Sequence, residues 1–242
     1  MTATFDQWVE TVFDHPIAKA EWYWDEGFDS LWQSLAMTDV LTAKFLTRPF
    51  LQSHRLKKYS LAQVGQGIWF LVGESSPAQP AHALLRREVA LRDRMACIHA
   101  MTEFFRSFVA PAAPGQVDVD SDPFHIACYM WWDIFPTWGG PNSGEPEIHA
   151  MCLRVMSEVL DLPSDLCRLS ALHGLNHWHL HHREQVVNLI GGFLAKRGNL
   201  SPRIREYASS ARQASSQLRC EQTPNRPSGK LLQHHSFSVC KL

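Results

Sequence analysis

The stretch that decides the fold runs over residues 162–179 and reads LPSDLCRLSALHGLNHWH. Pro163 followed by small polar and acidic residues is typical of the first turn of a helix, and leucines then recur at helical spacing. His173, Asn176 and His177 fall on the face that these leucines define. A polar cluster on such a face indicates a hydrogen-bond network, a metal site or an acid/base pair, and the sequence leaves all three open.

Helix signals recur on both sides of this stretch. Thr4 with Gln7 forms a capping box, and Ser60 is placed to cap a second helix. Gly65 and Gly67 lie inside that second helix, where glycine is unfavourable unless another helix packs closely there. Pro49 is expected to end an earlier helix. The predicted helices outside the opening stretch are 5–14, 39–46, 61–72, 84–109 (one long helix or two abutting ones), 123–135, 147–160, 184–196 (the partner of the His173 helix) and 202–217.

The pattern predicts an all-α protein, because no segment alternates in the way that a β-strand requires. Short Pro- and Gly-rich links join successive helices, which favours antiparallel helix pairs stacked as an α-solenoid of the HEAT-like kind. We expect an N-terminal helical segment over 1–59, a helical-repeat domain over 60–217 and a basic, disordered tail over 218–242.

The composition favours a cytoplasmic protein. The chain has 242 residues, of which 45% are apolar, and this length suffices for a substantial core. The first residues show neither a basic start nor an apolar run of the signal-peptide type, and no apolar run is long enough to span a membrane. The six cysteines are therefore expected to be reduced thiols, and none are spaced as CxxC.

Charge is unevenly distributed along the chain. The segment from Lys196 to residue 242 contains nine Lys/Arg and two acidic residues, which gives it a net charge of +7. Because the whole chain has a net charge of −1, the remaining residues carry −8. A basic tail of this kind can contact nucleic acid. It lacks dense Lys/Arg blocks and has few aromatic residues, so nucleic-acid binding is the less favoured expectation and solubility the more favoured one.

Two His-x-x-Cys pairs are candidate metal ligands. His125 with Cys128 and His149 with Cys152 lie on two adjacent predicted helices, and residues three apart share a helix face. Together they could supply a tetrahedral His₂Cys₂ zinc site. The alternative, which we favour, is that both cysteines are small core residues within apolar stripes.

His173 and His177 form a second candidate, because residues four apart on a helix can chelate one metal ion. A zinc protease is excluded, since Gly174 stands where the catalytic glutamate would be required. A buried pair of histidines, hydrogen-bonded without metal, is the favoured alternative. We therefore expect no resident cofactor, with zinc as the competing expectation.

Trp131, Trp132 and Asp133 place a carboxylate beside two large aromatic side chains. Such a group can wall a binding pocket. Ordinary helix packing by the two indoles, with a capping aspartate, is the alternative.

Three segments, QVGQGIWFL (63–71), CYMWWD (128–133) and SALHGLNHW (170–178), resemble a family of bacterial all-helical proteins that are similar to HEAT repeats. The resemblance covers about residues 60–211 and implies the fold, but it implies no activity, substrate or partner. We therefore expect a helical-repeat scaffold or adaptor that binds another protein. The alternative is a metal-dependent or Cys/His-based enzyme with a pocket near His173 and His177.

Overall fold

The computed structural model describes residues 3–19, 21–73, 78–196 and 198–213, and all of the regular structure in these ranges is helical. The predicted all-α class is confirmed. The α-helices are α1 (Phe5–Phe13), α2 (Phe28–Ser34), α3 (Asp39–Leu51), α4 (Leu61–Val72), α5 (Leu91–Phe104), α6 (Ala110–Ala112), α7 (Pro123–Ile134), α8 (Pro146–Leu160), α9 (Asp165–Lys196) and α10 (Pro202–Gln213). Short 3₁₀ helices cover Trp22–Trp24, Ser53–Lys58 and Pro80–Leu85, and a π-helical turn covers Phe105–Val109.

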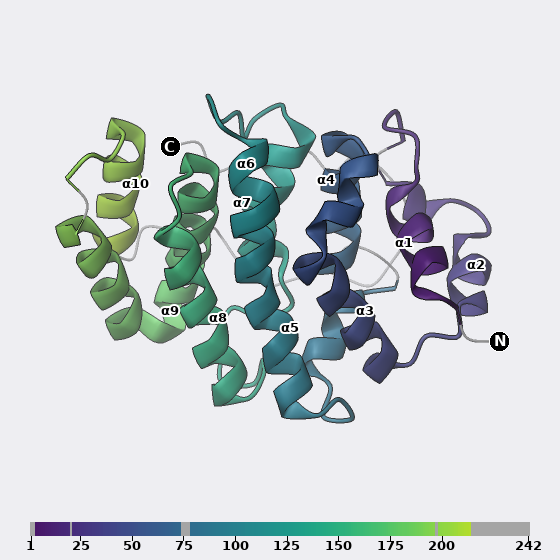
Figure 1. Cartoon of the computed structure of the whole chain (residues 1–242). Helices are drawn as coiled ribbons and strands as arrows, with labels where there is room; N and C mark the ends of the chain where they lie inside the picture. The colour runs from purple at the N-terminus through teal and green to yellow at the C-terminus, as the bar shows by residue number, and fades with distance from the viewer. Residues whose placement is uncertain (1–2, 20, 74–77, 197, 214–242) are drawn as a thin grey trace, which may run out of the picture.

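The helices are arranged in two rows that run across the molecule (Figure 1). In one row α4 packs beside α1 and α7, α7 beside α9, and α9 beside α10. In the other row α5 lies between α3 and α8, and α8 also packs on α9. From α3 to α9, with the short α6 left aside, successive helices therefore alternate between the rows, so that each row brings together segments that are distant in the sequence.

Aromatic side chains join the two rows. Trp131 of α7 is fully buried, and its ring packs against Phe50 of α3 and Phe104 of α5 at centroid distances of 5.6 and 5.8 Å. Phe105, in the π-helical turn, lies 5.1 Å from the same indole. Large rings in edge and tilted contact fill the space between rows efficiently, and burial of each contributes about 1.5–3 kcal/mol.

Two glycines of α4 allow close contact with neighbouring helices. A Cβ atom added to Gly65 of α4 would lie 2.9 Å from backbone atoms of Pro123 and Phe124 at the start of α7, and one added to Gly67 would overlap the ring of Phe13. The prediction of tight helix contact at Gly65 and Gly67 is therefore confirmed. The predicted capping box at Thr4 is present on α1, and Ser60 caps α4 as predicted, with Gln63 completing a second capping box.

Two predicted helix boundaries are wrong. Helix α3 passes through Pro49 and ends at Leu51, because a proline in the last turn deprives the helix of only one backbone hydrogen bond. The long helix expected over 84–109 begins at Leu91, because Ala90 before it has a non-helical backbone conformation (φ −54°, ψ 135°). The separate helix predicted over 184–196 is confirmed, since α9 consists of two helices that meet at non-helical backbone at His182 (φ −130°, ψ 40°).

One core cluster contains residues from Phe5 to Ala211, on both sides of the predicted boundary after residue 59. The division of the chain into domains stays a prediction, and the tail over 218–242 lies outside the described residues. None of the helices in the described ranges combines the length and the apolar character needed to cross a membrane.

The crossing of α4 and α7 can be tested with two glycine substitutions. Gly65→Ala should lower the free energy of unfolding by about 1–3 kcal/mol, because the new methyl group meets backbone that can move only if the helices separate. Gly192→Ala is the matched control, since its Cβ would meet nothing within 4 Å inside α9, and it should raise the free energy by about 0.5–1 kcal/mol. Urea denaturation measures both, and a shift of the same sign in both variants would contradict the close crossing.

Candidate functional site

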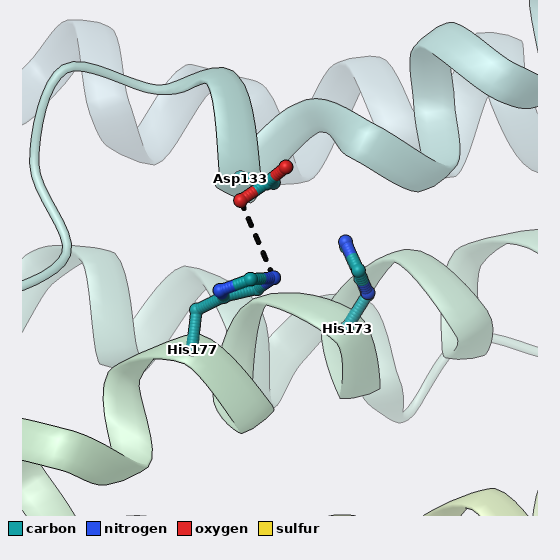
Figure 2. A group of neighbouring side chains, drawn as sticks. All are labelled: Asp133, His173 and His177. Carbon is teal, nitrogen blue, oxygen red and sulfur yellow. Dashed lines mark ion pairs between the residues drawn. The ribbon is translucent and has the colours of Figure 1, made fainter. Parts of the chain in front are cut away.

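Three potential metal ligands converge where α7 meets α9. Asp133 lies in the last turn of α7, and His173 and His177 project toward it from α9 (Figure 2). In the part of the chain that the structure describes, these residues form the one group of three or more potential ligands whose ligand atoms all lie within 4.8 Å of one another. His177 Nε2 lies 3.3 Å from Asp133 Oδ1, and the two imidazole centroids are 4.7 Å apart.

Gly174 makes this convergence sterically feasible. It lies between the two histidines in sequence, and a Cβ atom there would come within 2.5 Å of Trp132 Cβ and 2.8 Å of Met156 Sδ. Because Gly174 has no Cβ atom, α7 can approach α9 closely enough for Asp133 to reach His177. Gly174, which occupies the position where a zinc protease would need its catalytic glutamate, therefore has a packing role.

A ring of aromatic side chains surrounds the three ligands. The Tyr129 ring stacks on His173 with a centroid distance of 4.2 Å, and the Trp138 ring lies 5.3 Å from that of His177. The Trp138 indole N–H also donates to the carbonyl oxygen of Asp133 at 2.8 Å. From α10, the Tyr207 hydroxyl lies 2.9 Å from His173 Nδ1 and 3.2 Å from the Tyr129 hydroxyl. The site is thus built by α7, α9, α10 and the loop after α7.

Burial sets the protonation states of the site. Desolvation lowers the pKa of His173 to about 3, and the neighbouring His177 lowers it further. Burial also raises the pKa of the Asp133 carboxyl and lowers that of the His177 imidazole, while the attraction between the two opposes both shifts. At neutral pH His173 is therefore an uncharged imidazole, the form in which histidine binds metals.

One polar atom of the site has no hydrogen-bond partner. His173 Nε2 is buried and unpaired, and it is the ring nitrogen opposite the one that contacts Tyr207. An unsatisfied buried polar atom costs about 1–3 kcal/mol. This nitrogen is therefore not engaged by the protein and is available to a ligand held between His173, His177 and Asp133.

The His-x-x-Cys pairs do not meet. No three of His125, Cys128, His149 and Cys152 have ligand atoms within 4.8 Å of one another, so the predicted His₂Cys₂ arrangement is absent among these described residues. The reason is topological, because the first pair lies on α7, beside α4 and α9, and the second on α8 in the other row. His125 instead accepts the backbone N–H of Asp118 at 3.1 Å.

The cysteines are poorly suited to nucleophilic chemistry. Cys128 and Cys152 are fully buried, and desolvation raises the pKa of both thiols. Cys167, close in sequence to His173, is also buried, and its thiol pKa is raised to about 11. The thiolate is the reactive form. The structure thus gives no support to the Cys/His version of the enzyme hypothesis.

Of the predicted aromatic pocket only Asp133 reaches the site. Trp131 and Trp132 are both fully buried, the first between the helix rows and the second against Phe135 and Gly174. Both indoles therefore lie in the core, as expected for ordinary helix packing, and they do not line the site. The aromatic side chains beside the two histidines are Tyr129 and Trp138.

A separate groove of about 1100 Å³ opens between α8 and the second half of α9. Its walls include three histidines, His149, His181 and His182, together with apolar side chains such as Leu153 and Leu189. His182 Nε2 donates to the carbonyl oxygen of Gly139 at 3.0 Å, which ties the loop before α8 to α9. Burial lowers the pKa of His149.

Sequence reasoning missed three site residues. Tyr129 could have been found, because it precedes Asp133 by one helical turn and so shares its face. Trp138 and Tyr207 carry no local signal, since one lies in a loop and the other on α10, 34 residues after its partner His173.

Comparison of the chain with protein-family models, with curated proteins and with solved structures finds no match. The family resemblance stays a prediction, and the site geometry carries the functional argument.

The burial of His173 predicts a specific dependence of stability on pH. The unfolded chain binds a proton at His173 below pH 6.5, whereas the folded protein does so only near pH 3. The contribution of His173 to the free energy of unfolding is therefore fully present above pH 6.5 and decreases as the pH falls toward 3. His173→Gln should reduce this fall between pH 6.5 and 4.5 by up to about 1.4 kcal/mol per pH unit. Urea denaturation at several pH values measures the slope.

His181→Gln is the control, because His181 is exposed and lies beyond the site. It should keep the slope of the wild type. Identical slopes in all three proteins would show that His173 is not buried in an uncharged state.

Proposed function

We propose that this protein is a metal-dependent enzyme whose single divalent transition-metal ion is bound by Asp133, His173 and His177. The observation that carries the proposal is the convergence of these three ligands around the buried, unpaired Nε2 of His173. This favours the alternative that the sequence had ranked second, because the sequence contains the histidine pair but does not reveal the carboxylate that faces it.

The ligand set restricts the metal. Two imidazoles and one carboxylate suit Zn²⁺ or Fe²⁺, whereas Ca²⁺ and Mg²⁺ prefer oxygen ligands alone. Three protein ligands leave coordination positions for water or substrate, which distinguishes catalytic from structural sites. The side chains of Asp133 and His177 are 23% and 28% exposed, so solvent reaches the site from their side.

The surrounding residues support a reaction at this position. A divalent ion bound here would supply Lewis acidity and lower the pKa of a bound water molecule. The stacked Tyr129 and the adjacent Trp138 limit the approach of solvent to the two imidazoles. Asp133 is held in place by the neighbouring indole, which bonds to its backbone, and by the ion pair with His177.

Metal binding is directly measurable. Untagged wild-type protein, stripped with chelator, should bind one equivalent of Co²⁺ with visible d–d absorption, and Zn²⁺ should displace it. Asp133→Asn and His177→Ala should each weaken binding by at least about 10–100-fold, since each removes a ligand or its charge.

His181→Ala is the matched control, because it removes an exposed histidine from the same helix. It should bind Co²⁺ as the wild type does. Absence of binding in the wild type, or equal loss in the control, would contradict the proposed site.

A second candidate function follows from the helix arrangement. We also propose that the two rows form a short HEAT-like α-solenoid, with the groove between α8 and α9 serving to bind a cytoplasmic protein partner. The alternation of successive helices between rows and the open groove of about 1100 Å³ support this scaffold role. Leu189→Asp, which places a charge in the groove, should abolish capture of a partner in a pull-down without affecting Co²⁺ binding.

A further inference from the structure

Tyr207 is the side chain that hydrogen-bonds to His173 from outside the group of three candidate ligands. It belongs to α10, which buries Ile204, Tyr207, Ala208 and Ala211. Its hydroxyl lies 2.9 Å from His173 Nδ1, a normal hydrogen-bond distance, and 3.2 Å from the hydroxyl of Tyr129. The imidazole is thus bonded at one nitrogen, while the other points toward Asp133 and His177.

A neutral imidazole carries one proton, and two arrangements satisfy this geometry. If Tyr207 donates to Nδ1, then Nε2 carries the proton and is a buried donor without an acceptor. If Nδ1 donates to Tyr207, then Nε2 presents a lone pair, and the tyrosine hydroxyl can donate to Tyr129. The second arrangement uses the Tyr207 hydroxyl as acceptor and donor at once and leaves His173 with no N–H that lacks an acceptor, so it is favoured.

We infer that Tyr207 is the positioning residue of the site: its hydroxyl oxygen accepts the Nδ1–H of His173 and leaves Nε2 unprotonated and aimed at the Asp133–His177 pair. This positioning role rests on the proposed metal site, because it matters only if His173 binds a metal. The hydrogen bond from Nδ1–H to Tyr207 would keep Nε2 of His173 unprotonated before a metal ion binds, so that binding does not require the imidazole to change tautomer. Tyr207 itself would not contact the metal.

Tyr129 belongs to the same cluster, because its ring stacks on the face of His173 and its hydroxyl is the group to which Tyr207 can donate. A control must therefore lie outside this cluster. Tyr59→Phe is the matched control, because it removes the same atom from a tyrosine whose ring packs against Phe13 of α1. Only Tyr207→Phe removes the acceptor of the His173 proton.

The first measurement uses metal-free, full-length protein at pH 7. Long-range ¹H–¹⁵N NMR reports the tautomer of each histidine, and the His173 signals are identified by their loss in His173→Gln. The wild type and Tyr59→Phe should show His173 with protonated Nδ1 and unprotonated Nε2. Tyr207→Phe should shift His173 toward the opposite tautomer. A wild type with protonated Nε2, or an unchanged tautomer in Tyr207→Phe, would overturn the inference.

The second measurement is Co²⁺ affinity from the d–d absorption. Tyr207→Phe should bind about 10–100-fold more weakly than the wild type, the usual effect of losing an outer hydrogen-bond partner of a ligating histidine. Tyr59→Phe should stay near the wild type, and an equal loss in both variants would overturn the inference. If the wild type binds no Co²⁺ while the tautomer responds to Tyr207→Phe as expected, the proposed metal site fails and the assignment of Tyr207 stands.

Discussion

The close approach of α7 to α9 at Gly174 is the constraint on which the rest of the site depends. Because this residue has no Cβ, Trp132 can lie directly against the α9 backbone, and the two helices share one buried interface. That interface orients the polar side chains of both helices toward each other. Without it Asp133 and His177 would lie on separate surfaces, and each would be solvated independently.

Placing polar groups in this interface costs stability. The packing around Trp131 and Trp132 is dense and apolar, yet three ionisable side chains lie immediately beside it. Burial opposes the charged forms of Asp133 and His177, and the ion pair compensates only partly. A purely structural interface would gain more from apolar residues at these positions, and this cost supports the binding role that we propose for the cluster.

The sequence predicted the helical class well, because caps and proline positions are local signals. The helix that begins at Phe5 was placed from the capping box at Thr4, the helix that begins at Leu61 was placed from the capping residue Ser60, and the close packing at Gly65 was inferred from the cost of glycine inside a helix. Boundaries failed where the local signal was misleading, since α3 continues through Pro49 and the helix expected from residue 84 begins at Leu91. For the site, the His173–His177 pair was visible from its spacing, whereas Asp133 had been grouped with the two buried indoles. Its true partners depend on how α7 lies against α9, which no local pattern encodes.

The position of Tyr207 has a consequence for the order in which the site is assembled during synthesis. Tyr207 follows His177, the last of the three candidate ligands, by 30 residues (207 − 177), so at a translation rate of about 5–20 residues per second it is made about 1.5–6 s after all three exist. Until α10 docks, the hydrogen bond between Tyr207 and His173 Nδ1 is not formed. A nascent chain would therefore hold the complete set of candidate ligands before it holds the residue that we propose to select the tautomer of His173. In the proposed metal site, tight binding would then follow the docking of α10.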